Sequence, residues 1–487
     1  MEPKNNDRLK RSAFSSMIWK FAERVCAQLV SLVVSIFLAR MLMPEDYSVV
    51  SIVAIFFAFC NIFISGGLNS SLIQKKDATV EDYSTVLYLN MLMAAVLYGL
   101  MFFCAPLIAG LYHKPQIVPI IRVMGLTFFV SGLKSVLSAY ISSCLDFKRF
   151  FLSTITGTLV SAVVGITMAY RGLGAWALVA QEMTNTVIDT VILYLSTRLR
   201  FVRTFSVKRI KGLFGYGWKI MVSSLVAVAY DQINPLIVGL KFTPADLAFY
   251  NKGCSFPGLI NNTVSDTLAS VLFPVMAKVQ DDKEDVLNIT RRYVKTASFV
   301  IFPLMAGLFA VSDNFVRVLL TDKWLPAAPY IRIFAVSYMF NLIQVGNLQA
   351  IKAIGRSDIT LVLEVLKKSI YFAFIAMFVF FADDPQTFAL SSICCTVVAT
   401  VINTFPNRKL LGYRYRSQLA DILPNLLITF AMGAVVMAMG SLPCNAALLL
   451  FLQVLTGVLV YVGLSVITRN ENFCYLLQLL LQLLKRG

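Results

Sequence analysis

The chain contains almost no histidine and no paired cysteines. His113 is the only histidine in 487 residues, so neither a histidine-based catalytic triad nor a histidine-ligated zinc site is expected. The nine cysteines lie mostly in apolar stretches without paired spacing, which argues against a disulfide framework or a metal site. The glycine-rich string before Lys219 is interrupted by Trp218 and follows no strand, so it does not predict an ATP-binding loop. We therefore expect that the protein is not an enzyme and that it binds no metal ion and no cofactor.

Charge is also scarce, and apolar residues dominate. Charged residues make up 14% of the chain and hydrophobic residues 58%, whereas ordinary soluble domains carry about 25% charged residues. The mean hydropathy is +0.74. Such a composition predicts an all-α, polytopic membrane protein whose chain lies mostly in lipid.

Apolar runs of about 20 residues, bounded by proline, glycine or charge, predict 14 spanning helices. They lie at 13–42, 47–67, 84–110, 116–143, 150–170, 174–197, 212–241, 246–277, 294–320, 328–352, 359–382, 386–406, 419–440 and 445–468. The run after Arg469 is too short to span and ends in cations, so it predicts an amphipathic helix at the membrane surface.

The net charge of +17 follows the membrane topology. If the N-terminus is cytoplasmic, almost every cytoplasmic connection is rich in Lys and Arg, and the opposite loops carry only scattered cations. The most basic connection runs from Arg198 to Lys211. Because this pattern explains the excess charge, we expect no nucleic-acid partner, and an even number of spans places both termini in the cytoplasm.

The sequence repeats itself after about 200 residues. Trp19-Lys20 recurs as Trp218-Lys219, and Pro44-Glu45-Asp46 recurs as Pro244-Ala245-Asp246. Pro119-Ile120-Ile121-Arg122 recurs as Pro329-Tyr330-Ile331-Arg332. Repeats of this size in a membrane protein are typical of transporters, whose substrate site lies between the repeats. We expect an N-terminal lobe at 1–197, a basic linker at 198–211, a C-terminal lobe at 212–410, and two extra helices with the tail at 411–487.

Polar side chains form stripes on three of the predicted spans. Charge inside a membrane costs at least about 2.5 to 3.5 kcal/mol and persists where it faces a cavity or a partner. The stripes predict a hydrated groove for a polar, anionic headgroup. Its substrate-binding candidates are Lys20, Arg24, Gln28, Lys219, Tyr230, Asn234, Lys252 and Asn262. The carboxylates Glu23, Asp231 and Asp266 are candidates for proton or sodium coupling. Snorkelling to the interface and pairing between helices are the structural alternatives for each of these residues.

Four strings resemble a known family: LARMLMPEDYSVVS, GGLNSSLIQKKD, LFPVMAKVQDDKE and VSDNFVRVLLTDKW. They are similar to the Wzx-type polysaccharide transporters, which flip lipid-linked oligosaccharides, and most of all to colanic acid exporters. The resemblance covers most of residues 10–415. The same superfamily includes multidrug exporters and the lipid II flippase.

The resemblance implies a two-lobed fold that moves an undecaprenyl-diphosphate-linked oligosaccharide across the bacterial inner membrane by alternating access. Membrane lipids surround such a transporter, a polysaccharide polymerase and assembly proteins are implied partners, and the transport unit is expected to be a monomer. Lys20, Arg24 and Lys219 would then bind the diphosphate or acidic sugars. A multidrug exporter is one alternative, but it would need mainly acidic groups in its cleft. A membrane glycan polymerase is the other alternative. The resemblance implies a long outer catalytic loop for enzymes of that kind, whereas every outer loop predicted here is short.

Overall fold

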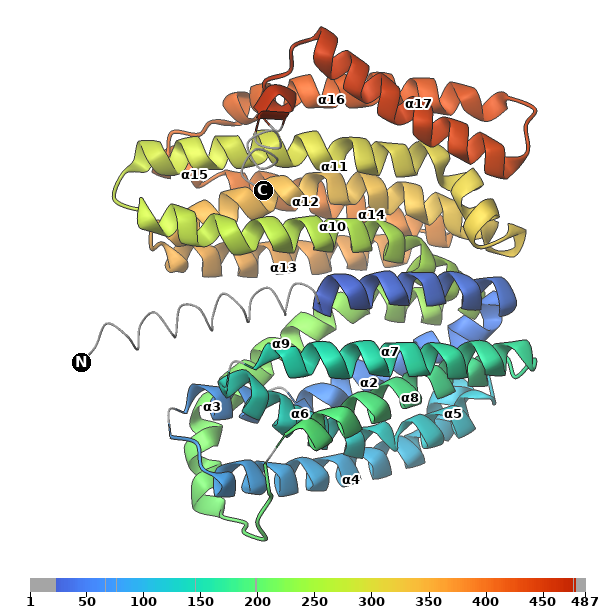
Figure 1. The fold of residues 1–487 in the computed structure, drawn as a ribbon, viewed down its shortest axis with the longest axis vertical. Coiled ribbons are helices and arrows are strands. Elements are labelled where there is room, and N and C mark those ends of the chain that lie inside the picture. The colour runs from blue at the N-terminus through green and yellow to red at the C-terminus, as the bar shows by residue number, and fades with distance from the viewer. Residues whose placement is uncertain are drawn as a thin grey trace. The chain divides into compact units, whose positions relative to one another are not determined.

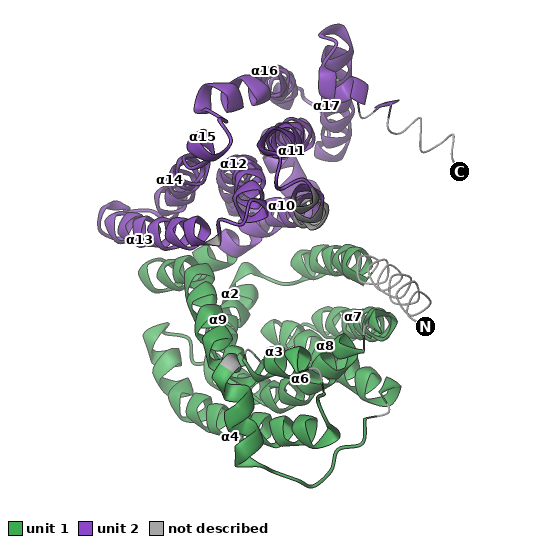
Figure 2. Ribbon diagram, turned by 90° about the vertical axis from the view of Figure 1, so that its left-hand side faces the viewer, with its two compact units in different colours: residues 1–248 green, residues 249–487 purple. Residues whose placement is uncertain are grey.

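The computed structural model describes residues 23–65, 67–75, 77–144, 146–197, 199–475 and 477–478, apart from the side chains at 216, 266–271, 273–274, 277–278 and 357. Within these ranges the regular elements are helices and no strand is found, which confirms the all-α class. The chain forms two compact units, residues 1–248 and 249–487 (Figure 2). Each unit is a bundle of long helices (Figure 1).

Unit 1 begins with a helix whose described part is Glu23–Met41. The elements that follow are α2 (Pro44–Ser65), α3 (Leu68–Gln74), α4 (Val80–Leu111), α5 (Ile117–Met124), α6 (Thr127–Ser143), α7 (Phe147–Tyr170), α8 (Ala175–Ser196) and α9 (Val207–Lys241). Helix α8 packs against α7 and α6, and α9 packs against α2, α3 and α4. Val34 and Leu38 of the first helix join a buried cluster with Ala162 of α7 and Leu178 of α8.

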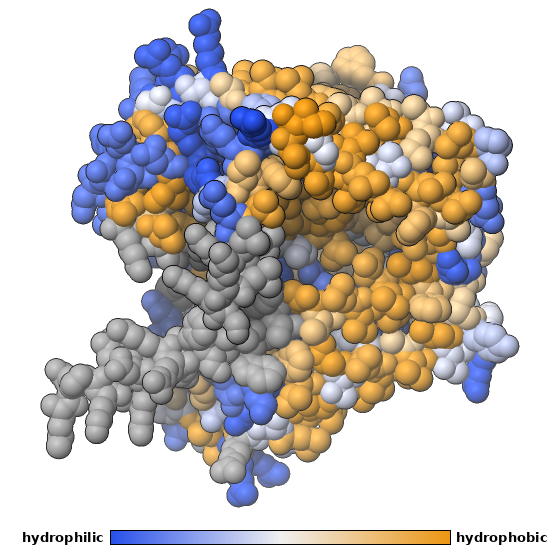
Figure 3. Space-filling model, turned by 45° about the horizontal axis from the view of Figure 1, so that its top comes forward, coloured by the Kyte–Doolittle hydropathy of each residue, from blue (hydrophilic) through white to orange (hydrophobic). Residues whose placement is uncertain are grey.

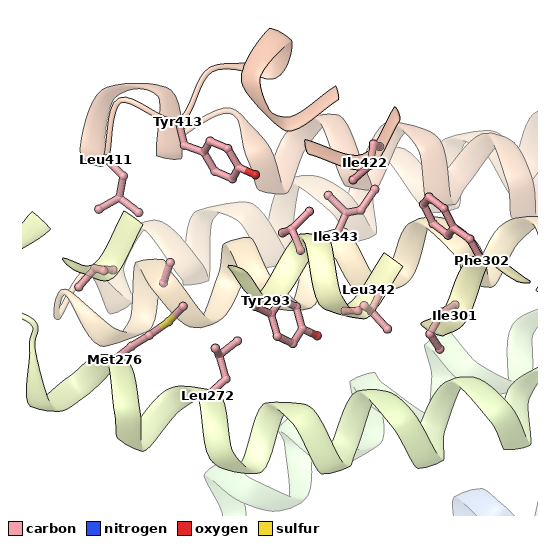
Figure 4. Packing of buried hydrophobic residues seen from close by; sticks show 14 of the residues in the cluster. Leu272, Met276, Tyr293, Ile301, Phe302, Leu342, Ile343, Leu411, Tyr413 and Ile422 are labelled. Carbon is pink, nitrogen blue, oxygen red and sulfur yellow. The ribbon is translucent and has the colours of Figure 1, made fainter. Parts of the chain in front are cut away.

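Unit 2 is built around α11. Its elements are α10 (Pro244–Lys278), α11 (Lys283–Leu319), η1 (Asp322–Ala327), α12 (Ala328–Ala353), α13 (Ser357–Phe381), α14 (Pro385–Thr404), α15 (Asn407–Leu410), α16 (Tyr415–Ala438), η2 (Met439–Ser441) and α17 (Ala446–Ile467). Helix α11 packs against α12, α16 and α17. Figure 4 shows a buried cluster that joins α10, α11, α12 and α16, with Leu272 of α10, Tyr293 of α11, Leu342 of α12 and Ile422 of α16.

Apolar side chains cover much of the outside of the helices. Phe103, Phe380 and Ile467 are each more than three-quarters exposed, and apolar residues gather in broad areas of the face drawn in Figure 3. A soluble protein rarely exposes so much contiguous apolar surface. The chain is therefore a multi-pass membrane protein whose outward apolar residues meet lipid.

Every predicted span that falls in the described ranges corresponds to a helix. Ten helices of the described part are long and apolar enough to cross a membrane by length and composition. The helices at the four remaining predicted positions, α8, α10, α12 and α13, have suitable lengths but carry more polar residues. The count of 14 spans stays a prediction. The predicted span at 116–143 is interrupted between α5 and α6, at Gly125 and Leu126.

The repeated Pro-X-Asp string starts a helix in both places. Pro44 opens α2 and Pro244 opens α10. The backbone N–H of Met43 donates to Asp46 Oδ2 at 3.0 Å, and that of Thr243 donates to Asp246 Oδ2 at 3.0 Å. Proline suits the first helical turn, and a carboxylate there accepts from otherwise unbonded amides. The repeat is thus a shared helix-start motif that follows the first helix and α9.

The basic connection predicted at 198–211 lies against unit 1. Residues 199–206 are not helical, and α9 already begins at Val207. The Val202 amide donates to Ser84 Oγ at 2.9 Å, and Arg209 donates to Asp82 Oδ1 at 2.9 Å and to Thr79 Oγ1 at 3.0 Å. The hydrogen bond to Asp82 raises the pKa of Arg209 above its ordinary value. These contacts, together with the packing of α9 on α2 and α3, explain why the compact units divide after the linker, at 248.

A close approach of two glycines holds α9 against the start of α3. A Cβ atom on Gly67 would overlap the carbonyl oxygen of Gly217, and one on Gly217 would lie 2.9 Å from Ser71 Oγ. Ser71 Oγ also donates to the carbonyl oxygen of Leu213 at 2.9 Å. Only glycine at both positions allows this backbone contact.

Replacing Gly67 with alanine is therefore expected to destabilise unit 1. Overpacking of this kind typically costs about 1 to 3 kcal/mol, so the midpoint of thermal unfolding of the purified protein should fall by several degrees. Gly215→Ala on the same helix is the matched control, because nothing lies within 4 Å of its Cβ position. Equal midpoints for the two variants would contradict the importance of this contact.

Candidate functional site

The predicted polar stripe of the first helix lies on the side opposite a lipid-facing row. Leu29, Val33 and Phe37 are each more than half exposed. At about 100° per residue, these three positions lie roughly across the helix from Arg24 and Gln28. Arg24 is exposed and Gln28 half-buried. That Arg24 and Gln28 line a substrate groove stays a prediction. Lys20, the first residue of the proposed site, lies outside the described residues.

Glu23 has a partner within unit 1. Its Oε1 accepts a hydrogen bond from Thr154 Oγ1 of α7 at 3.1 Å, and its side chain is half-buried. This contact ties the first helix to α7 within an apolar setting. It gives Glu23 a structural role beside the predicted role in ion coupling.

Lys219 lies on the face of α9 that points away from its packing partners. Phe214, Gly217 and Met221 of α9 line a small cavity shared with α2, α3 and α4, whereas Lys219 is about 160° around the helix from the middle of that face. Its side chain is exposed, and no hydrogen bond or ion pair of it is found in the described part of the chain. An exposed ammonium 12 residues into a helix, about 18 Å from its start, is suited to bind an anion.

The remaining candidates of α9 lie further along the same helix. Tyr230 is half-buried, Asp231 is exposed, and Asn234 is buried with no partner for its Oδ1 in the described structure. Tyr230 and Asn234 share the face of Lys219 by helical spacing, with Asp231 at its edge. By spacing these residues form one row along α9, and their place in a substrate site stays a prediction.

The candidates of α10 belong to unit 2. The Lys252 side chain is buried, with its Nζ 5.7 Å from the ring centre of Trp324 and 6.0 Å from that of Phe256. Such a position allows cation–π attraction. Asn262 is exposed and accepts a hydrogen bond from Asn261 at 3.2 Å. The side chain of Asp266 lies outside the described residues.

Sequence reasoning missed an ion pair in the middle of unit 1. Lys134 Nζ of α6 lies 2.6 Å from Asp189 Oδ2 of α8, and the second carboxylate oxygen of Asp189 is buried without a hydrogen-bond partner in the described structure. The carboxylate is almost fully buried and the ammonium more than a third exposed. The sequence signal was the presence of a charged residue within each apolar run. The sequence of one helix does not show which other helix packs against it, so the pairing could not be predicted.

A row of amides and hydroxyls between α12 and α14 was also missed. Gln344 donates to Thr400 Oγ1 at 3.1 Å and accepts from Asn403 at 3.1 Å. Asn407, next along the seam, donates to Asn347 Oδ1 at 2.7 Å. The signal was the helical spacing of Ser337, Asn341, Gln344 and Asn347 and of Thr396, Thr400, Asn403 and Asn407. Because these groups bond to one another, they join helices inside lipid.

The arginines of the third repeated string have local partners. Arg332 donates to Ser312 Oγ at 2.7 Å and pairs with Asp313, and the Arg122 guanidinium lies 4.2 Å from the centre of the Phe102 ring. These contacts suit packing roles within each unit. Within the described residues, no group of His, Cys, Asp and Glu could hold a metal ion.

A family model described as "Polysaccharide biosynthesis protein" matches residues 37–329. The teichuronic acid biosynthesis protein TuaB of Bacillus subtilis (strain 168) is 23% identical over 94% of this chain and 96% of its own length. The lipopolysaccharide biosynthesis protein WzxC of Escherichia coli (strain K12) is 22% identical over 88% of this chain and 89% of its own. Among solved structures, the lipid II flippase MurJ in an inward closed conformation superposes with a TM-score of 0.72 at 14% identity, covering 94% of this chain and 99% of that one.

Proposed function

This chain belongs to the polysaccharide biosynthesis protein family, and we propose that it is a flippase for a lipid-linked oligosaccharide. Its substrate would be an undecaprenyl-diphosphate-linked repeat unit, carried across the bacterial inner membrane for surface polysaccharide synthesis. The sequence relatives named for teichuronic acid and lipopolysaccharide biosynthesis support this substrate class, and the MurJ-like fold supports a transporter architecture.

The observation that carries the proposal is the exposed ammonium of Lys219 within a helical segment, Gly217–Lys241, that is long and apolar enough to cross a membrane. A diphosphate carries at least two negative charges, so cations in a hydrated cleft attract it while the polyprenyl tail stays in lipid. Arg24 and Lys20 would act with Lys219, and Lys252 would contribute from the second half. Gln28, Tyr230, Asn234 and Asn262 would replace the water around sugar hydroxyls.

The cycle would alternate between two states that open to opposite sides of the membrane. Glu23, Asp231 and Asp266 are the groups proposed to couple this movement to protons or sodium. Both termini would lie in the cytoplasm, because the connections rich in Lys and Arg are retained on that side. The transport unit would be a monomer, with a polymerase and assembly proteins acting on its product.

Two features favour a flippase over the alternatives. The cations of the candidate site oppose the binding of cationic drugs, which a multidrug exporter would need to attract. At the end of the bundle opposite the basic connections, the described loops are short, such as 112–116 and 171–174. None of these short loops corresponds to the large outer catalytic loop of a glycan polymerase.

Reconstitution tests the proposed function directly. We expect vesicles containing the purified protein to move a fluorescent undecaprenyl-diphosphate oligosaccharide between leaflets, measured by its accessibility to a membrane-impermeant quencher. An imposed proton or sodium gradient should change the rate several-fold. Indifference to both gradients would overturn the coupling role, and transport of a cationic dye in place of the glycolipid would favour a multidrug exporter.

A further inference from the structure

Unit 1 contains a groove between the end of α3 and the start of α9, separate from the predicted stripes. Its volume is about 740 Å³, within the range of about 300 to 1,000 Å³ that is usual for small-ligand sites. The lining residues are Ser71, Gln74, Lys75, Ser206, Lys208, Arg209, Gly212 and Leu213.

The groove wall carries three positive charges and no negative one. Lys75 and Arg209 are both held by Asp82, at 2.5 Å from Nζ to Oδ2 and 2.9 Å from Nη1 to Oδ1. Asp82 is completely buried and does not line the groove. The carboxylate therefore holds both cations at one side of the groove. Arg209 also donates to Thr79 Oγ1 at 3.0 Å and pairs with the half-exposed Glu81.

Lys208 supplies the third charge. Its side chain is exposed, and no hydrogen bond or ion pair of it is found in the described part of the chain. Gln74 and Ser206 add neutral groups that can donate hydrogen bonds. Lys208 is thus the cation of the groove that no carboxylate of the described structure neutralises. A phosphate or diphosphate group accepts several charge-assisted hydrogen bonds, so it can bind Lys208 together with these neutral donors.

We propose that this groove binds the diphosphate of the lipid-linked substrate as a first docking point, before the substrate enters the transport cleft. The inference rests on the proposed function. The groove lies at the end of unit 1 where the basic connections meet, which the positive-inside rule places in the cytoplasm, where such a substrate is made. Exposed cations there also raise the local concentration of an anionic headgroup.

The first test measures binding alone. The full chain in nanodiscs of zwitterionic lipid is titrated with inorganic pyrophosphate by calorimetry, at low and at high salt. We expect Lys208→Gln to weaken binding about threefold to tenfold, and Lys211→Gln to change it less than twofold. Lys211 is the matched control because it is an exposed lysine of the same helix outside the groove. Equal affinities for all three proteins would overturn the proposal.

The second test identifies the source of the phosphate. In the vesicle assay, Lys208→Gln should raise the substrate concentration at half-maximal flipping about threefold and leave the maximal rate unchanged. If this concentration stays unchanged while phosphatidylglycerol nanodiscs abolish pyrophosphate binding, the groove binds bulk anionic lipid and the substrate docking role is wrong. If the wild-type protein flips nothing, the proposed function fails, whereas the pyrophosphate titration still decides whether the groove binds anions.

Discussion

Charge reversal of Lys219 to glutamate is expected to reduce flipping of the lipid-linked substrate at least tenfold. The lysine is exposed and has no partner in the described structure, so the change removes no contact that holds the fold together. Two unit charges 4 Å apart interact by about 4 kcal/mol at an effective dielectric constant of 20, and the reversal converts attraction of the diphosphate into repulsion. Initial rates in vesicles, or surface polysaccharide in cells lacking the native protein, give the measurement.

Two variants make this result specific. Lys219→Arg keeps the charge and should retain most of the flipping rate, whereas Lys211→Glu changes an exposed lysine on the same helix, outside both the stripe and the docking groove, and should have little effect. Normal export by Lys219→Glu at normal expression would show that this lysine binds no anion during transport. A loss shared by Lys211→Glu would indicate a general effect of cytoplasmic charge instead.

Removing the carboxylate of Asp421 is expected to have the largest effect on stability. Asp421 is buried on α16 and accepts from Arg291 of α11 at 2.8 and 2.9 Å and from Tyr413 at 2.9 Å. Lys295 lies 3.6 Å away. Breaking a buried pair typically costs about 3 to 5 kcal/mol, and less where one partner is partly exposed, as Arg291 is. We expect about 2 to 4 kcal/mol for Asp421→Asn.

The effect should appear as a clear fall in the thermal unfolding midpoint and in the amount of protein recovered from membranes. Asp358→Asn is the control, because its pair with Arg356 is exposed and within two residues, and exposed pairs contribute little. If both variants unfold at the same temperature, the contact does not fix α16 to α11. A loss of flipping without a loss of stability would indicate a different role for Asp421.

Hydrogen bonds to α11 also fix the last two helices, α16 and α17, within unit 2. The sequence placed α16 and α17 outside the repeat and left their role open. In the structure, Asn425 of α16 donates to Ser298 Oγ of α11 at 2.8 Å, and Tyr461 of α17 donates to the Phe299 carbonyl oxygen at 2.7 Å. Both helices therefore pack on α11 as part of unit 2. Phe473, at the start of the predicted amphipathic tail, packs beside them.

Local signals predicted the helices well, although α11 begins at Lys283, 11 residues before the predicted span at 294–320. Apolar runs mark where lipid requires a helix, and the Pro44 and Pro244 strings mark helix starts, because both depend on neighbours along the chain. The partners of polar residues depend on contacts between distant segments. By sequence Arg291 is one more cation of a predicted cytoplasmic connection, and nothing near it in the chain indicates its pairing with Asp421, 130 residues away. Lys134 and Asp189 likewise meet only when α6 and α8 pack together.

The compact units divide at a different place from the sequence repeat, and the predicted lobes stay a prediction. By sequence, α9 is the counterpart of the first helix and should open the second lobe. Its first half instead packs on α2, α3 and α4, where Gly67 and Gly217 meet. A sequence repeat shows that two segments are similar to one another, whereas a compact unit shows which helices pack together. The predicted site at Lys219 therefore lies in the first compact unit.

Helix α9 contains Pro235 in its interior. Because proline has no N–H, the carbonyl oxygen of Asp231 lacks its usual donor in the helix, and α9 bends most easily within the turn after Asp231, the single carboxylate of this helix. The start of α9 is held by the hydrogen bonds from Ser71 to Leu213 and from Arg209 to Asp82. A bend at Pro235 would therefore move residues 236–241 relative to Asp231 and Lys219, which precede the proline and stay with the held start.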